Sequence, residues 1–97
     1  MSPPHEPELP LTATLQLKHR HKAFLISLTD DGALELHMDG CLRKRRERGE
    51  REPQYVWTNV ELEWEEHHYI EARYWAQERR LRVTVNGDPL FDGRWPR

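Results

Sequence analysis

Apolar residues at every second position are the feature that most constrains the fold of this chain. A β-strand points successive side chains to opposite faces, so a half-buried strand repeats every two residues, whereas an amphipathic helix repeats every three or four. Between charged and turn residues the apolar positions form these sets: Leu15 and Leu17; Phe24, Ile26 and Leu28; Leu34, Leu36 and Met38; Val56, Val60, Leu62 and Trp64; Ile70, Ala72 and Tyr74; Leu81, Val83 and Val85. The pattern predicts an all-β fold of roughly seven to eight short antiparallel strands.

One turn sequence predicts both a hairpin and its register. In TDDGA, residues 29–33, Gly32 stands at the third loop position, where a three-residue hairpin loop needs a left-handed residue. Thr29 then faces Ala33. The same register pairs apolar residues on one face of the sheet, namely Leu28 with Leu34, Ile26 with Leu36 and Phe24 with Met38.

Asp39-Gly40 and Asn86-Gly87 are the strongest short hairpin signals in the chain, and the second predicts that Val83 faces Leu90. The two turns also belong to a faint internal repeat. A shift of 47 residues superimposes His21 on His68, Leu34 on Leu81 and Gly40 on Gly87. Either two hairpins share spacing because strands and turns have preferred lengths, or a unit of about three to four strands is duplicated into two pseudo-repeats. Both interpretations predict a β-sandwich or a flattened barrel.

The length of 97 residues fits one domain. The first ten residues, MSPPHEPELP, hold four of the seven prolines, which remove backbone donors and favour an extended tail. We therefore expect a disordered Pro-rich tail at residues 1–10 and a single β domain at residues 11–97. The lone cysteine, Cys41, suits a reducing compartment, and no leader or membrane-spanning apolar run is present, so we expect a cytoplasmic protein with no membrane role.

The segment VWTNVELEWEEHHYIEARYW, residues 56–75, keeps its apolar residues at even positions in both halves. In a regular hairpin this parity requires a loop with an odd number of residues. Two loops satisfy the requirement, one at residues 65–67, which pairs Trp57 with Trp75, and one at residues 65–69, which pairs Glu61 with Arg73. We favour the shorter loop, because it stacks two indole rings.

The favoured register extends into a row of large side chains away from the main core face. With a loop at residues 77–80 and a turn at Asn86-Gly87, the row contains Trp57, Trp75, Arg82 and Phe91. Arg82 between two aromatic rings would make cation–π contacts. A shorter loop at residues 77–78 is disfavoured, because it places Arg73 opposite Arg82. Either the N-terminal strand or the second sheet covers this row, or the row is an open binding surface.

The segment RKRRERGER, residues 43–51, is the second candidate binding feature. Its six basic residues are Arg43, Lys44, Arg45, Arg46, Arg48 and Arg51. Arginine binds phosphate well, so the segment would support weak, salt-sensitive binding of single-stranded nucleic acid. Glu47 and Glu50 dilute its charge, and the net charge of the whole chain is −2. The alternative is a charged loop or edge strand at residues 43–53 that prevents sheet-to-sheet aggregation.

The histidines do not follow a recognised metal-binding pattern. His19 and His21 share one face of a strand, and His67 and His68 are adjacent, but no cysteine or carboxylate joins them at a ligand spacing. We expect solvated turn residues, with no metal and no cofactor. The chain also has no nucleophile motif and no phosphate-binding glycine loop, so we expect that it is not an enzyme.

Two functions fit these features. The first is a non-catalytic protein-interaction or self-associating β module, in which a protein partner or a second copy in a homodimer covers the aromatic row. The alternative is a weak nucleic-acid-binding accessory domain that uses residues 43–51. Salt separates them, because binding of arginine to phosphate collapses between roughly 50 and 200 mM salt and an aromatic interface survives.

Overall fold

The computed structural model describes residues 13–63 and 66–96, which form eight β-strands and no helix. The strands are β1 (Ala13–His19), β2 (Lys22–Leu28), β3 (Leu34–Met38), β4 (Cys41–Arg46), β5 (Gln54–Glu63), β6 (Glu66–Trp75), β7 (Arg80–Val85) and β8 (Asp88–Arg94). These residues accordingly include no helical segment that could cross a membrane. The predicted tail at residues 1–10 lies outside the described residues.

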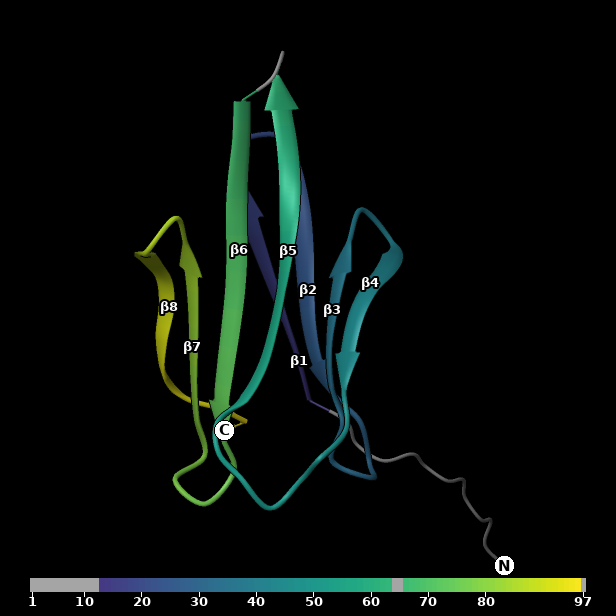
Figure 1. Ribbon diagram of the computed structural model, residues 1–97, viewed down its shortest axis with the longest axis vertical. Coiled ribbons are helices and arrows are strands. Elements are labelled where there is room, and N and C mark those ends of the chain that lie inside the picture. The colour runs from purple at the N-terminus through teal and green to yellow at the C-terminus, as the bar shows by residue number, and fades with distance from the viewer. Residues whose placement is uncertain (1–12, 64–65, 97) are drawn as a thin grey trace, which may run out of the picture.

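Each half of the chain folds into one antiparallel sheet. Strands β1–β4 form the first four-stranded sheet and β5–β8 the second, each in chain order. In Figure 1 the second sheet faces the viewer, and β1 of the first sheet passes behind β5 and β6. The predictions of an all-β fold and of a β-sandwich are therefore confirmed.

The core lies between the two sheets and is built from alternate residues of their strands. The buried apolar side chains are Phe24, Ile26, Leu34 and Leu36 from the first sheet, and Val56, Val60, Ile70, Ala72, Tyr74, Leu81, Val83, Val85 and Trp95 from the second half of the chain. Removing this apolar surface from water is the dominant favourable term in folding. The period-two pattern of the sequence therefore marks the face of each sheet that turns inward.

The β2–β3 hairpin has the register that its turn predicts. The pairs are Leu28 with Leu34, Ile26 with Leu36 and Phe24 with Met38. Thr29 donates its backbone N–H to the carbonyl of Ala33 at 2.9 Å, and Gly32 adopts a φ of 89°. This left-handed conformation is what the last loop position requires, so the turn and the apolar alternation agree.

The turns Asp39-Gly40 and Asn86-Gly87 have the same backbone geometry. Their φ angles are 50° and 86° in the first turn and 49° and 89° in the second, as in a type I′ turn. A β-bulge accompanies each turn, after Leu36 in the β3–β4 pairing and after Val83 in the β7–β8 pairing. These two positions are again 47 residues apart. Matching turns and matching bulges support the interpretation of the chain as two pseudo-repeats.

The bulge in β7–β8 makes one predicted pair wrong. Val83 pairs with Phe91 and not with Leu90. The neighbouring pair joins Thr84 to Pro89, which has no N–H to donate, and Leu90 is left as the extra residue. The shift turns Phe91 toward the core, against which it packs as a partly buried residue.

Both predicted registers of the β5–β6 hairpin are also wrong. Trp57 pairs with Glu71, and Glu61 pairs with His67, so His67 lies within β6 rather than in a loop. A register shift between Glu61 and Glu63 inserts one extra residue, which produces the observed parity without an odd-numbered loop. The parity rule holds only for a regular ladder, and the bulge makes this ladder irregular.

The β6–β7 hairpin adopts the register that places Arg73 opposite Arg82. The two guanidinium groups use different partners. The Cζ atom of Arg73 lies 4.7 Å from the ring centroid of Tyr55 on β5, whereas Nε of Arg82 lies 3.8 Å from Asp92 on β8. Contacts in opposite directions offset the like-charge repulsion that the sequence argument used to reject this register.

The Arg-rich segment is an edge strand followed by a loop. Residues 43–46 lie in β4, at the edge of the first sheet, and residues 47–53 lead to β5 without strand structure. All six residues of β4 are exposed. Two side chains of this edge strand, Lys44 and Arg46, lie beside β5 of the second sheet.

Candidate functional site

The structure does not bring the predicted aromatic row together. Its members lie on different cross-strand pairs: Trp57 beside Glu71, Trp75 beside Arg80, Arg82 beside Arg73, and Phe91 beside Val83. All three hairpins of the second sheet differ in register from the arrangement that aligned these residues. The row is therefore corrected to separate positions, of which Phe91 packs against the core.

A different group of side chains surrounds Trp57. Its ring centroid lies 5.9 Å from that of Tyr69, a diagonal neighbour on β6, and Nζ of Lys44 lies 5.5 Å from the Trp57 ring centroid. Trp57 is 42% exposed and Tyr69 is 47% exposed. Lys44, Trp57 and Tyr69 are called the Trp57 patch below. A cation over the face of an exposed indole, beside a second aromatic ring, gives the patch both apolar area and positive charge.

The Trp57 patch joins the edges of the two sheets. Lys44 comes from β4 and Trp57 from β5, and these two strands contact each other at one side of the sandwich. Lys44 pairs with Leu36, so it is oriented like a core residue, but its position on the outermost strand leaves it exposed. Sequence reasoning missed Tyr69, whose only signal was an aromatic residue at an odd, solvent-facing position of its strand.

A groove of about 500 Å³ lies beside the patch, between β4 and β5. Its lining residues are Lys44, Arg45, Arg46, Glu47, Arg48, Gly49, Tyr55, Val56 and Trp57. Arg46 donates from Nε to the backbone carbonyl of Tyr55 at 3.3 Å, which ties the two strands together. The structure thus gathers Lys44, Arg46 and Arg48 around two aromatic rings.

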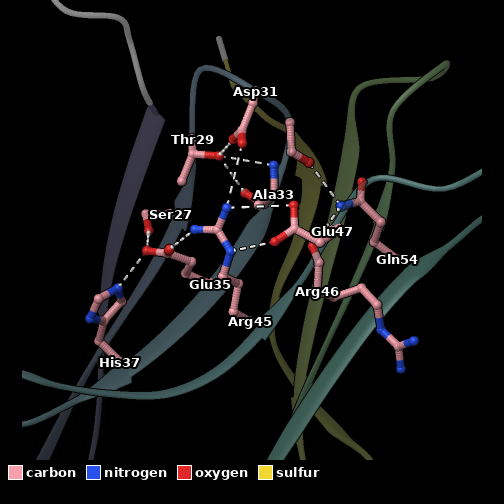
Figure 2. Close-up of polar contacts among 11 residues, drawn as sticks. Ser27, Thr29, Asp31, Ala33, Glu35, His37, Arg45, Arg46, Glu47 and Gln54 are labelled. Carbon is pink, nitrogen blue, oxygen red and sulfur yellow. Dashed lines mark hydrogen bonds and ion pairs between the residues drawn. The ribbon is translucent and has the colours of Figure 1, made fainter.

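Gln54 holds this side of the sandwich in place. Its side chain is buried, and Nε2 donates to the carbonyl of Gly32 at 2.9 Å and to the carbonyl of Arg46 at 3.2 Å (Figure 2). Satisfying two backbone acceptors at once connects the β2–β3 turn to the end of β4. The groove is therefore bordered by ordered backbone and not by an isolated loop.

Arg45 is engaged by carboxylates on the outer face of the first sheet, as Figure 2 shows. Its guanidinium donates to Glu47 at 2.7 Å and to Glu35 at 2.5 Å, and it lies 3.5 Å from Asp31. Hydrogen bonds to Glu47 and then to Glu35 raise the pKa of Arg45 above its ordinary value. Because its donors already serve carboxylates, Arg45 is a poor ligand for phosphate among the six predicted basic residues.

Glu35 is the central acceptor of this network. It accepts a hydrogen bond from Ser27 Oγ at 3.4 Å and contacts Nε2 of His37 at 3.1 Å. Burial alone would raise the pKa of Glu35, but hydrogen bonds with His37 and Arg45 lower it below the usual value. Glu35 is therefore ionised at neutral pH and balances the charge of Arg45.

Two histidines connect the sheets at the end of the sandwich. Nε2 of His19 on β1 lies 2.9 Å from Nδ1 of His68 on β6, and Nε2 of His68 lies 3.1 Å from Glu66. A neutral His68 that donates from Nε2 to Glu66 has an unprotonated Nδ1. This Nδ1 accepts a hydrogen bond from the Nε2–H of His19. The prediction that these two histidines are solvated turn residues is wrong, because they bond to each other. The described residues contain no group of three or more side chains placed to hold a metal ion.

The histidine pair makes stability depend on pH. Burial, followed by the charges of His68 and Arg20, lowers the pKa of His19 below 6.5, while Glu66 opposes the shift. An unfolded chain then binds a proton at His19 more readily than the folded chain, so stability present above pH 6.5 is lost as pH falls through the folded pKa. A hydrogen bond with His68 lowers the pKa of Glu66 below 4.5. The stability that the ionised Glu66 contributes is therefore lost only at a lower pH than that of His19.

We therefore expect the melting temperature to fall as pH drops below 6.5, and His19→Gln to flatten this part of the profile. Glutamine keeps a donor for His68 without titrating in this range. His21→Gln, at an exposed position of the adjacent β1–β2 turn, is the control and should retain the fall. Thermal melts from pH 8 to 5 measure the effect, and identical profiles for wild type and His19→Gln would contradict the assignment.

The fold and the site together define a class, a small antiparallel β-sandwich with an aromatic and cationic surface where its two sheets meet. Comparison with known protein families, curated proteins and solved structures finds no match to this chain.

Proposed function

We propose that this chain is a non-catalytic β module that binds a protein partner through the Trp57 patch. The observation that carries the proposal is an indole left 42% exposed between a cation and a second exposed aromatic ring. Tryptophan, tyrosine and arginine are frequent energetic centres of protein interfaces. Both aromatic residues lie on paired strands, which hold them in position before binding and lower the entropy lost on association.

The charges around the patch indicate what kind of partner would fit. Lys44, Arg46 and Arg48 line the groove next to Trp57. A partner segment that combines an apolar side chain with neighbouring acidic residues would cover the indole and pair with these cations. The single cysteine, Cys41, is exposed, and we place the module in a reducing compartment such as the cytoplasm.

Single-stranded nucleic acid is the second candidate ligand. The observation that favours it is the presence of three basic residues, Lys44, Arg46 and Arg48, beside Tyr55 and Trp57 in one groove. Bases stack on such rings while phosphates contact the cations. Engagement of Arg45 by carboxylates and a net charge of −2 weaken this alternative. So few cations support only weak, salt-sensitive binding.

Trp57→Ala tests the proposal. We expect at least about a tenfold loss of partner binding with little change in melting temperature, because an exposed interface aromatic supplies binding energy rather than core packing. Wild type and variants are immobilised and used to capture partners from lysate at about 50 and 200 mM salt. Leu42→Ala is the matched control, since Leu42 is 52% exposed on β4 and lies outside the groove lining.

A triple variant separates the two ligands. Changing Lys44, Arg46 and Arg48 to Ser should weaken protein binding less than Trp57→Ala does at the higher salt, because the indole buried on binding supplies most of the binding energy and exposed charges mainly affect the rate of encounter. The protein-binding proposal is wrong if the captured species is nucleic acid, if Trp57→Ala still captures it, and if its capture is lost with the triple variant or at the higher salt.

A further inference from the structure

Four strands form the outer edges of the two sheets, β1 and β4 in the first and β5 and β8 in the second. Each presents one backbone edge that no other strand pairs with in the described part of the chain. An unpaired edge is a template for pairing with another chain, and proteins block it with charges, prolines or bulges.

Three of these edges carry such blocks. Strand β4 has four consecutive basic residues and a bulge. Strand β8 contains Pro89, Asp92 and a bulge. Strand β5 contains a bulge, and the backbone carbonyl of Tyr55 already accepts a hydrogen bond from Arg46.

Strand β1 has none of these blocks. Its sequence, ATLQLKH, contains no proline or glycine, and all seven residues pair with β2 without a register shift. Its charge is limited to Lys18, with His19 added when that residue is protonated. The free edge of β1 is therefore regular and almost neutral, which are the properties that favour strand pairing.

The backbone groups on this free edge can be assigned. Asp39 donates its N–H to the carbonyl of Ala23 at 2.9 Å, so the backbone groups of Ala23 face β3 and, by alternation, those of Phe24 face β1. Leu17, the partner of Phe24, therefore faces β2. By the same alternation, the N–H and C=O groups that point away from β2 belong to Thr14, Gln16 and Lys18.

We propose that the free edge of β1 pairs antiparallel with β1 of a second copy of this chain. The two first sheets, each of four strands, then form one continuous sheet. With a two-fold axis through Gln16 the whole strand is used, so that Gln16 faces its own copy, Leu15 faces Leu17, Thr14 faces Lys18 and Ala13 faces His19. The outward groups of the strand would make about six backbone hydrogen bonds in this register.

Side-chain chemistry favours the same register. An axis through a residue pairs odd positions with odd positions, so Leu15 and Leu17 of both copies remain on the core side of the joined sheet. On the outer side Lys18 faces Thr14, so no two like charges oppose each other. The interface contains no residue of the Trp57 patch. A test of this dimer is therefore independent of a test of the proposed function.

Gln16→Pro tests the pairing in the full chain. Proline removes the N–H of Gln16, which points away from β2, so an edge strand tolerates it in the monomer while the contact between copies is lost. Gln16→Thr keeps the N–H and is the control. Sedimentation equilibrium over the micromolar range should show a dimer for wild type and Gln16→Thr, and at least a tenfold weaker dimer for Gln16→Pro. A monomeric wild type, or an unchanged dimer for Gln16→Pro, would overturn the proposal.

Hydrogen exchange of the wild-type protein provides a measurement that needs no variant. The amides of Thr14, Gln16 and Lys18 have no strand partner among residues 13–63 and 66–96 of one copy, and they should exchange rapidly at low protein concentration. Their protection should rise as the concentration is increased through the dimerisation range, while that of Leu17, which faces β2, stays high. Protection of these three amides that does not change with concentration would refute the interface even if Gln16→Pro fails to fold.

Discussion

Leu34→Ala and Leu81→Ala should each lower the free energy of unfolding by about 2–5 kcal/mol. Both side chains are fully buried, at 0% exposure, and they occupy equivalent positions in the two pseudo-repeats. The loss combines the transfer free energy of the removed atoms with the cavity that the neighbours cannot fill. Because a domain is stable by only about 5–15 kcal/mol, a change of this size would be plain in urea denaturation.

Leu42→Ala is the control for this prediction. Leu42 is 52% exposed, so its truncation should change the free energy of unfolding by less than about 0.5 kcal/mol. The two core variants should also each unfold in a single transition, because residues of both sheets form one hydrophobic cluster. Two separate transitions for either variant would mean that the sheets are stabilised independently.

Trp95→Ala should cost about 3–5 kcal/mol of stability. Trp95 is only 4% exposed and packs edge-to-face on Tyr74, with the ring centroids 5.7 Å apart and an interplanar angle of 85°. The backbone N–H of Trp95 donates to the carbonyl of Arg79 at 2.8 Å, which connects the segment after β8 to the β6–β7 turn. Trp95 thus closes one end of the sandwich core.

Two other substitutions give this prediction its controls. Trp95→Phe keeps an aromatic ring against Tyr74 and should recover most of the lost stability. Trp57→Ala removes an exposed tryptophan, so thermal denaturation should show a much smaller change than for Trp95→Ala. Equal losses for Trp57→Ala and Trp95→Ala would show that Trp57 is also a core residue and would remove the basis of the Trp57 patch.

Local patterns in the sequence predicted the strands, the inward faces and the β2–β3 hairpin. Alternation with a period of two follows from strand geometry, and the φ of 89° at Gly32 follows from the demands of one loop. Both signals are contained within a few neighbouring residues. They could therefore be read without knowing where the rest of the chain lies.

Registers that contain a bulge could not be derived in this way. A single extra residue, such as Leu90, shifts every later pair, and the cost of a bulge depends on the packing of all four strands. The opposition of Arg73 and Arg82 shows the same limit, because it is offset by Tyr55 and Asp92 on the two outer strands. The register between β6 and β7 therefore depends on contacts with β5 and β8 and not on the two paired strands alone.

The composition of the candidate site was decided only by the tertiary structure. Sequence reasoning identified Trp57 and the basic segment separately, but Lys44 meets Trp57 only because the edges of two different sheets come together. His19 and His68 are 49 residues apart, and their bond likewise requires one sheet to stack on the other. A local pattern specifies which way a side chain points within its own sheet, whereas contacts between sheets depend on how the two apolar faces pack to exclude water.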